Sequence, residues 1–154
     1  MFQEIECSPF HGKVLAAIHR ECFEKSWTEE SFVELLSRPS VSGFLAVSAQ
    51  EQTPMGFILL QMAADEGEIL TLAVSSSYRR IGIANRLLER VLTVAEAAGG
   101  QKIHLEVAQN NRGALAFYDQ WNFRQTGIGP GYYDMTEGRV DAVMMVREID
   151  HLSK

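Results

Sequence analysis

Cysteine, positive charge and long apolar runs are all scarce in this chain. Its two cysteines, Cys7 and Cys22, form no C-x-x-C pair, so we expect free thiols in a reducing cytoplasm. The net charge of −6 argues against a non-specific nucleic-acid binder, which is usually basic. The longest apolar stretches, near 43–47 and 56–60, are far too short to cross a bilayer, and the N-terminus carries no basic leader. We therefore expect neither a membrane span nor a signal peptide.

The histidines lack the spacing of a metal site, so no metal is expected. What is present is typical of a globular protein: 46% of the residues are hydrophobic and 22% are charged. We see no repeat, linker or low-complexity segment in the 154 residues. We therefore expect one domain over residues 1–154, with room for a sizeable core.

Hydrophobic periodicity predicts alternating helices and strands along the chain. The expected strands cover 2–7, 43–49, 55–62, 68–74, 102–107, 123–129 and 140–149, and the helical patterns cover 10–38, 84–95 and 111–121. We expect Thr28 to cap a second helix inside the first helical stretch, Asn111 to open the last helix and Asn122 to end it. This order predicts a mixed α/β sheet, antiparallel at first, with a parallel crossover through the long helix.

The segment Tyr78–Ala84, which reads Y-R-R-I-G-I-A, lies between a predicted buried strand and the long helix. A helix that starts there directs backbone N–H groups and the positive end of its dipole at one place, where an anion can bind. Gly82 lets a phosphate approach the backbone, and Arg79, Arg80 and Arg86 add charge that suits diphosphate oxygens. The same residues also fit a solvated turn. The segment is neither a nucleoside-triphosphate loop nor a dinucleotide-binding loop.

Glu106 is the first candidate for catalysis. Apolar residues alternate along 102–107, so His104 and Glu106 share the opposite face of that strand. The crossover rule places this strand beside the one that precedes the anion loop. Glu106 is then either a general base close to the anion site or a solvated strand carboxylate.

Further positions fit either binding or plain structure. Tyr118 shares an apolar helix face with Trp121, and its phenol either packs, with its hydroxyl on a carbonyl, or donates a proton to a leaving group. Asn111 is most simply a helix N-cap, and it can also bond a ligand that lies across the helix start. Tyr132 and Tyr133 lie in a predicted loop, where they either pack or line a peptide or amine pocket.

Together these segments resemble the GNAT superfamily of acyl-coenzyme A-dependent N-acetyltransferases over nearly the whole chain. The similarity is greatest to the RimI-type enzymes, which acetylate the N-terminal alanine of a small-subunit ribosomal protein. The stretches that carry it are Trp27–Glu29 with Phe32, Leu72–Val74, Tyr78–Ala84, Leu105–Val107, Asn111 through Tyr118 to Phe123, Tyr132-Tyr133, and Asp141-Ala142 with Met144. The coenzyme loop is general to the superfamily, whereas Leu105–Val107, the spacing from Asn111 to Tyr118 and the Tyr132-Tyr133 pair are together narrower and point to N-terminal amines.

The resemblance implies a fold of about seven strands and four helices, with acetyl-CoA as co-substrate. Glu106 would be the base and Tyr118 the acid, and Trp27, Tyr132 and Tyr133 would bind the substrate. The coenzyme would be held by Leu72, Ala73, Val74, Arg79, Arg80, Ile81, Gly82, Ile83, Ala84, Asn85 and Asn111. The partner would be a protein N-terminus, with no nucleic acid and no membrane, and the enzyme a monomer or weak dimer. The family commonly has basic residues where this chain has Ile128–Gly131, a departure that bears on substrate choice.

Two other functions fit the same residues: a GNAT enzyme for a small amine or a lysine side chain, and a non-catalytic acyl-coenzyme A-binding module. The presence of both Glu106 and Tyr118 disfavours the module. The reference pKa of an α-amine is about 7.7–8.0 and that of lysine about 10.4, so a single carboxylate is the more adequate base for an N-terminal amine. Direct attack on a thioester needs no covalent enzyme intermediate, so neither cysteine is required.

Overall fold

The chain folds around one mixed sheet in a computed structural model that describes residues 1–136 and 138–149, apart from the side chains of residues 131, 132 and 134. The strands are β1 (Phe2–Glu6), β2 (Val41–Ser48), β3 (Pro54–Ala63), β4 (Glu66–Val74), β5 (Lys102–Ala108), β6 (Arg124–Met135) and β7 (Gly138–Glu148). The α-helices are α1 (Gly12–Cys22), α2 (Glu29–Leu36), α3 (Ile83–Ala97) and α4 (Arg112–Gln120), and short 3₁₀ turns, η1 (Pro9–His11) and η2 (Ser76–Tyr78), precede α1 and α3. The expected mixed sheet with seven strands and four helices is confirmed for the described residues.

The strand order is β1-β2-β3-β4-β5-β7-β6. Neighbours pair antiparallel except β4 and β5, which are parallel because α3 crosses between them. The strand that carries Glu106 therefore lies beside the strand that precedes the anion loop, as the crossover rule predicts.

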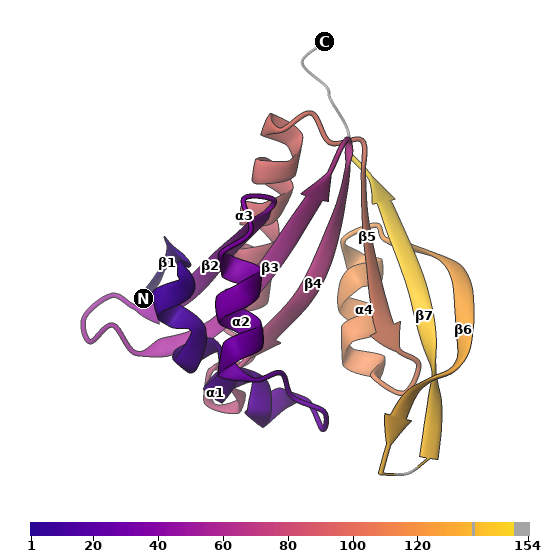
Figure 1. Ribbon diagram of the computed structural model, residues 1–154, viewed down its shortest axis with the longest axis horizontal. Coiled ribbons are helices and arrows are strands. Elements are labelled where there is room, and N and C mark those ends of the chain that lie inside the picture. The colour runs from indigo at the N-terminus through magenta and orange to yellow at the C-terminus, as the bar shows by residue number, and fades with distance from the viewer. Residues whose placement is uncertain (137, 150–154) are drawn as a thin grey trace.

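Helices cover both faces of the sheet (Figure 1), and each face has its own apolar core. Successive residues of the central strand β3 point to opposite faces: Phe57 and Leu59 pack with α1 and α2, whereas Ile58 and Leu60 pack with α3 and α4. Such a strand reads as a continuous apolar run because neither face meets water. Within the described residues, no helix combines the length and the apolarity needed to cross a membrane.

The helix boundaries follow local capping chemistry. The Thr28 hydroxyl accepts a hydrogen bond from the Ser31 N–H at 3.1 Å and starts α2. Asn111 Oδ1 accepts one from the Ala114 N–H at 3.1 Å and starts α4. Asn122, with φ of 68°, follows α4 in the left-handed conformation. All three predicted boundaries are confirmed.

The predicted loop around Tyr132 and Tyr133 is wrong, because strand β6 continues through both residues to Met135. Its pairing with β7 shifts register between Gly129 and Tyr133, and Tyr133 then pairs with Val140. The Gly-Pro-Gly sequence therefore makes a bulge inside the strand instead of ending it. Glu137, part of the expected hairpin turn, lies outside the described residues.

Strands β4 and β5 are joined at one end only. Their pairs are Glu66 with Lys102, Gly67 with Ile103 and Glu68 with His104, and no further pair follows. Figure 1 shows the two strands starting together and running apart toward their C-terminal ends. On its other edge β4 has a register shift, in which Leu60 pairs with Ile69 and Leu59 with Thr71, so Leu70 is the extra residue of a bulge.

Candidate active site

The site begins where β4 leaves β5. Leu72, Ala73 and Val74 lie beyond the last β4–β5 pair and are paired on their other edge with β3. Among the described residues no strand pairs with their β5-facing edge. Two side chains reach the Val74 carbonyl instead: Arg79 Nε donates to it at 3.1 Å and the Cys22 thiol at 3.4 Å. Apart from the Val74 carbonyl, the backbone groups on this edge of Leu72–Val74 have no strand partner among the described residues, and they are open to a ligand that lies along it.

The anion loop leads from this edge into α3. Arg80 and Gly82 have φ of 69° and 90°, and turns with such left-handed residues commonly form a concave surface of backbone N–H groups that suits an anion. The first helical bond runs from the Arg86 N–H to the Gly82 carbonyl at 3.1 Å, and no side chain caps α3. A Cβ built on Gly82 meets nothing within 4 Å, so the space before the helix is open. Free N–H groups, a helix dipole and open space together fit a phosphate.

The arginines near the loop have different roles. Arg79 is turned inward: besides the Val74 carbonyl it contacts Cys22 Sγ at 3.6 Å, which fastens the loop to the end of α1. Arg86 is drawn away to β1, where it pairs with Glu4 at 3.0 Å and lies 5.3 Å from the ring centre of Phe2. The expectation that Arg86 adds charge to the anion loop is therefore wrong. Arg80 is exposed and forms no bond to a described residue.

A hydrogen bond at the C-terminal end of helix α4 connects it to the start of α3, next to the anion loop. Trp121 Nε1 donates to Asn85 Oδ1 at 2.8 Å, which joins the residue that follows α4 to the first turn of α3. The Asn111 side chain is used as a cap at the opposite end of α4. The structure thus brings the loop and α4 together and accounts for the side chains of Asn85 and Asn111 by internal bonds.

Glu106 lies on β5 past the last pair with β4. Leu105 and Val107 are buried in the α3/α4 core, so Glu106 faces the side of the sheet that carries α1 and α2. It is half-buried and makes no hydrogen bond to a described residue. Partial desolvation raises the pKa of its carboxyl, and the negative charge of Glu68 raises it further. A carboxylate made more basic in this way suits proton abstraction.

Tyr118 lies on α4 in the core of the opposite face. It is 6% exposed, and its ring contacts those of Phe117 and Phe123 at centroid distances of 5.2 and 5.4 Å. Burial raises the pKa of the phenol, which therefore stays protonated at neutral pH. The hydroxyl bonds to no described residue, so the carbonyl partner considered above is not present.

On the α1/α2 side, Trp27 is held by His19. The rings are stacked at 4.9 Å, and the backbone N–H of Trp27 donates to His19 Nδ1 at 3.1 Å. His19 is 2% exposed, and burial lowers its pKa to about 4, so the ring is neutral and can accept that bond. Trp27 borders a hollow of about 290 Å³ whose floor includes Leu70, the bulge residue of β4.

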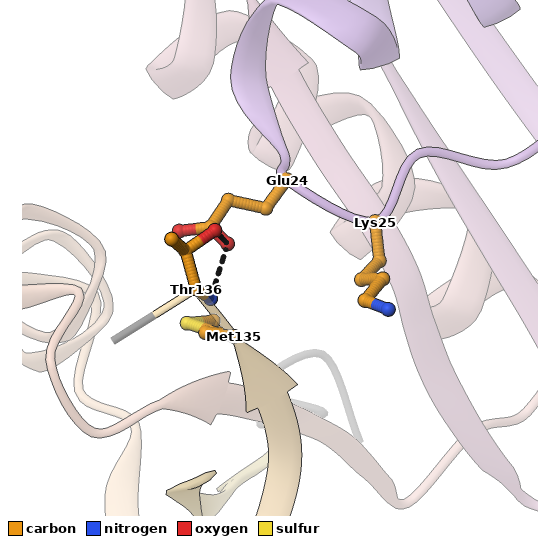
Figure 2. A pocket seen from close by; sticks show the side chains of 4 residues that line it. All are labelled: Glu24, Lys25, Met135 and Thr136. Carbon is orange, nitrogen blue, oxygen red and sulfur yellow. Dashed lines mark hydrogen bonds between the residues drawn. The ribbon is translucent and has the colours of Figure 1, made fainter. Parts of the chain in front are cut away.

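A second hollow, of about 460 Å³, lies between the α1–α2 connection and the β6–β7 hairpin. Figure 2 shows Glu24 reaching across to Thr136. Its Oε1 accepts bonds from the Thr136 N–H and hydroxyl, both at 2.8 Å, and these bonds lower the pKa of the Glu24 carboxyl. Met135 and Lys25 complete the lining. The two segments are more than 100 residues apart, so no local sequence pattern could have indicated this contact.

The tyrosine pair is only partly described. Tyr133 is half-buried on β6, and the side chain of Tyr132 lies outside the described residues. Glu68 and Thr71 on β4 were not indicated by the sequence. The Thr71 hydroxyl is enclosed and has no hydrogen-bond partner, an arrangement that costs about 1–3 kcal/mol unless a ligand or water bonds it. The described residues contain no cluster of three or more His, Cys, Asp or Glu that could hold a metal ion.

Comparison with known proteins covers most of the chain. A model described as acetyltransferase (GNAT) family matches residues 13–123. The [ribosomal protein bS18]-alanine N-acetyltransferase of Escherichia coli (strain K12) is 30% identical over 123 residues, which are 80% of this chain and 81% of that protein. The N-alpha-acetyltransferase of Saccharolobus solfataricus is 28% identical over 145 residues, 86% of this chain and 84% of that protein.

Solved structures of other proteins superpose on this chain over nearly its whole length. The crystal structure of the ribosomal-protein-S18-alanine N-acetyltransferase from Escherichia coli has a TM-score of 0.89 and 26% identity, and the match covers 97% of this chain and 95% of that one. Arabidopsis thaliana NAA60 in complex with acetyl-CoA has a TM-score of 0.85 at 21% identity, with 97% and 99% covered, and it shows the same fold.

Proposed function

Because this chain belongs to the acetyltransferase (GNAT) family, we propose that it transfers the acetyl group of acetyl-CoA to the N-terminal α-amine of a protein, with the N-terminal alanine of a ribosomal protein as its substrate. The sequence-based expectation of an acetyl-CoA-dependent N-acetyltransferase of this family is confirmed. The nature of the amine and the roles of individual residues are the proposal.

The observation that carries it is the position of Glu106 and Tyr118 on opposite faces of the sheet: Glu106 lies on β5 just past the last β4–β5 pair, and Tyr118 lies in the core on the α3/α4 face. A thioester that lies between the two strands can be approached by an amine from the α1/α2 face, where Glu106 is. Its sulfur then lies toward the α3/α4 face, where Tyr118 is. Base and acid are thus kept apart, one for the nucleophile and one for the leaving group.

The residues expected to bind the coenzyme are consistent with a thioester that lies between β4 and β5. The uncapped start of α3 would hold the pyrophosphate through the N–H groups of residues 81–85, with Arg80 adding charge. The β5-facing edge of Leu72–Val74 would bond the amide groups of the pantetheine arm, as a neighbouring strand would, through backbone groups other than the Val74 carbonyl. Arg79 would act indirectly, because its guanidinium holds the Val74 carbonyl and Cys22.

The proton balance explains why two groups are needed. An ammonium substrate loses two protons when it becomes an amide: the N–C bond forms, the C–S bond breaks, one proton goes to the sulfur and one to solvent. Glu106 accepts the proton that frees the amine lone pair. Tyr118, protonated because it is buried, donates to the departing sulfur.

The polypeptide substrate would bind on the face of the sheet that carries Glu106 and the helices α1 and α2. Trp27 borders one hollow on that side, and Glu24 with Thr136 lines the other. We expect Tyr133, on the hairpin that carries Thr136, to flank the substrate, together with Tyr132. A protein N-terminus fits this open approach between two segments.

The test is acetylation of peptides that begin Ala-Arg, measured by mass spectrometry beside the same peptides with blocked N-termini. We expect acetylation of the free α-amine alone. Acetylation of the blocked set at comparable rates would instead identify a lysine or small-amine enzyme. Glu106→Gln is expected to lower kcat/KM by about 10²–10⁴ without weakening coenzyme binding, and undiminished transfer would refute the assignment of the base.

A further inference from the structure

Glu68 and Glu106 point to the same face of the sheet from neighbouring strands. Glu68 pairs in register with His104, and Glu106 is two residues further along β5, so their side chains share one side. Ile69, the neighbour of Glu68, packs in the α3/α4 core, which turns Glu68 to the opposite face, that of Glu106. The carboxylate of Glu68 is exposed, whereas that of Glu106 is half-buried.

Neither carboxylate has a cation to offset its charge in the described structure. The nearby acidic residues differ: Glu66 pairs with His104 at 2.9 Å, and Glu148 pairs with Arg124 at 3.0 Å. On its β7 side Glu106 is paired with Met144, which carries no charge. The charged neighbour that affects the Glu106 carboxyl is thus Glu68, and the two like charges lie on the same face of the sheet with no compensating cation among the described residues.

We propose that Glu68 is a positioning residue of the reaction, which acts through Glu106: its negative charge makes Glu106 a stronger base and attracts the substrate amine in its ammonium form. An uncompensated pair of carboxylates at a substrate opening favours a cation between them. Because a free α-amine is largely protonated at neutral pH, the ammonium is the form that first meets the site. This inference rests on the proposed function, since it requires Glu106 to be the base.

The direct experiment follows the protonation of Glu106 by carbon NMR of glutamate labelled at the carboxyl, on the free enzyme. The resonance of Glu106 is identified by its absence in E106Q. In E68Q the pH midpoint of the Glu106 titration is expected to fall by about 0.2–0.7 pH unit, the range of an exposed charge pair. E68D, which keeps the charge, should retain more than half of that difference.

The matched control is E66Q, which removes a carboxylate from the same side of β4 two register pairs further from Glu106. We expect the E66Q midpoint to move by less than half the E68Q shift. A midpoint in E68Q equal to that of the wild type, or an equal shift in E66Q, would overturn the inference.

Steady-state kinetics give the second readout. E68Q is expected to raise KM for the peptide about two- to fivefold and to leave KM for acetyl-CoA unchanged. An equal rise in both constants would point to a general structural effect and count against the inference. The NMR titration needs no turnover, so it is separable from the proposed function, which fails if wild-type enzyme does not acetylate free N-termini or if E106Q is fully active.

Discussion

Replacing Tyr118 by phenylalanine separates catalysis from packing. The substitution removes one hydroxyl and keeps the ring, which is 6% exposed and packed against Phe117 and Phe123. Since that hydroxyl bonds to no described residue, its loss breaks no hydrogen bond within the described part of the chain. We expect the free energy of unfolding to change by less than about 0.5 kcal/mol, and the melting temperature by less than about 2 °C.

The catalytic effect should be much larger. A general acid in place contributes about 10²- to 10⁴-fold, which corresponds to about 3–5 kcal/mol of activation free energy. We therefore expect kcat of Y118F to fall by about that factor while KM for acetyl-CoA stays within about threefold. The assay follows release of the coenzyme thiol with a peptide that begins Ala-Arg, beside thermal melts of both proteins.

The matched variant is Phe123→Leu, which disturbs the same ring packing and leaves the phenol. It should lose about 1 kcal/mol of stability and keep most of its turnover number. If Y118F retains more than a tenth of wild-type kcat, or if it loses activity only in proportion to stability, Tyr118 is a packing residue and the assignment of the acid is refuted.

Three further outcomes can be checked. Cys7→Ser with Cys22→Ser should keep turnover within about twofold, because direct transfer needs no thiol and burial raises the pKa of Cys7 to about 12; a large loss would indicate an acyl-thiol intermediate. Gly82→Ala should raise KM for acetyl-CoA about five- to thirtyfold, because a φ of 90° costs a side chain about 1–2 kcal/mol; equal KM values would show that the loop does not hold the coenzyme. His19 has a pKa lowered from 6.5 to about 4, so the unfolded chain binds a proton first and the melting temperature should fall as pH drops from 6.5 to 4. Since other groups also titrate in this range, His19→Gln is the comparison, and an equally steep fall in that variant would contradict the role of His19.

Much of the fold could be predicted because its signals are local. The caps at Thr28 and Asn111 and the left-handed Asn122 depend on residues within one turn of each other. The alternation along β5 placed Glu106 and the apolar residues on opposite faces without knowledge of the neighbouring strands. The predicted strand at 123–129 was too short, because Gly129–Gly131 looks like a loop in isolation. Only the pairing with β7 shows that the ladder of hydrogen bonds resumes after it.

The candidate site was predictable in part for the same reason. The anion loop is one continuous segment, so its glycine and its helix start could be recognised directly. The ion pair of Arg86 with Glu4 could not be predicted, because Glu4 lies on a strand at the far edge of the sheet. The same holds for Glu24 and Thr136, which meet only when the hairpin folds over the α1–α2 connection.

The sequence by itself determined the order and periodicity of the elements, the family, and the identity of the residues offered as base, acid and coenzyme loop. The tertiary structure decided how those residues are oriented. It showed that β4 and β5 part after Glu68, that Glu106 and Tyr118 lie on opposite faces of the sheet, and that Glu68 shares the face of Glu106 with no compensating cation among the described residues. The physical reason is the sequence separation of the interacting residues, because caps, turns and alternation depend on near neighbours along the chain. The meeting of strands and charges depends on register and packing between segments that are distant in sequence.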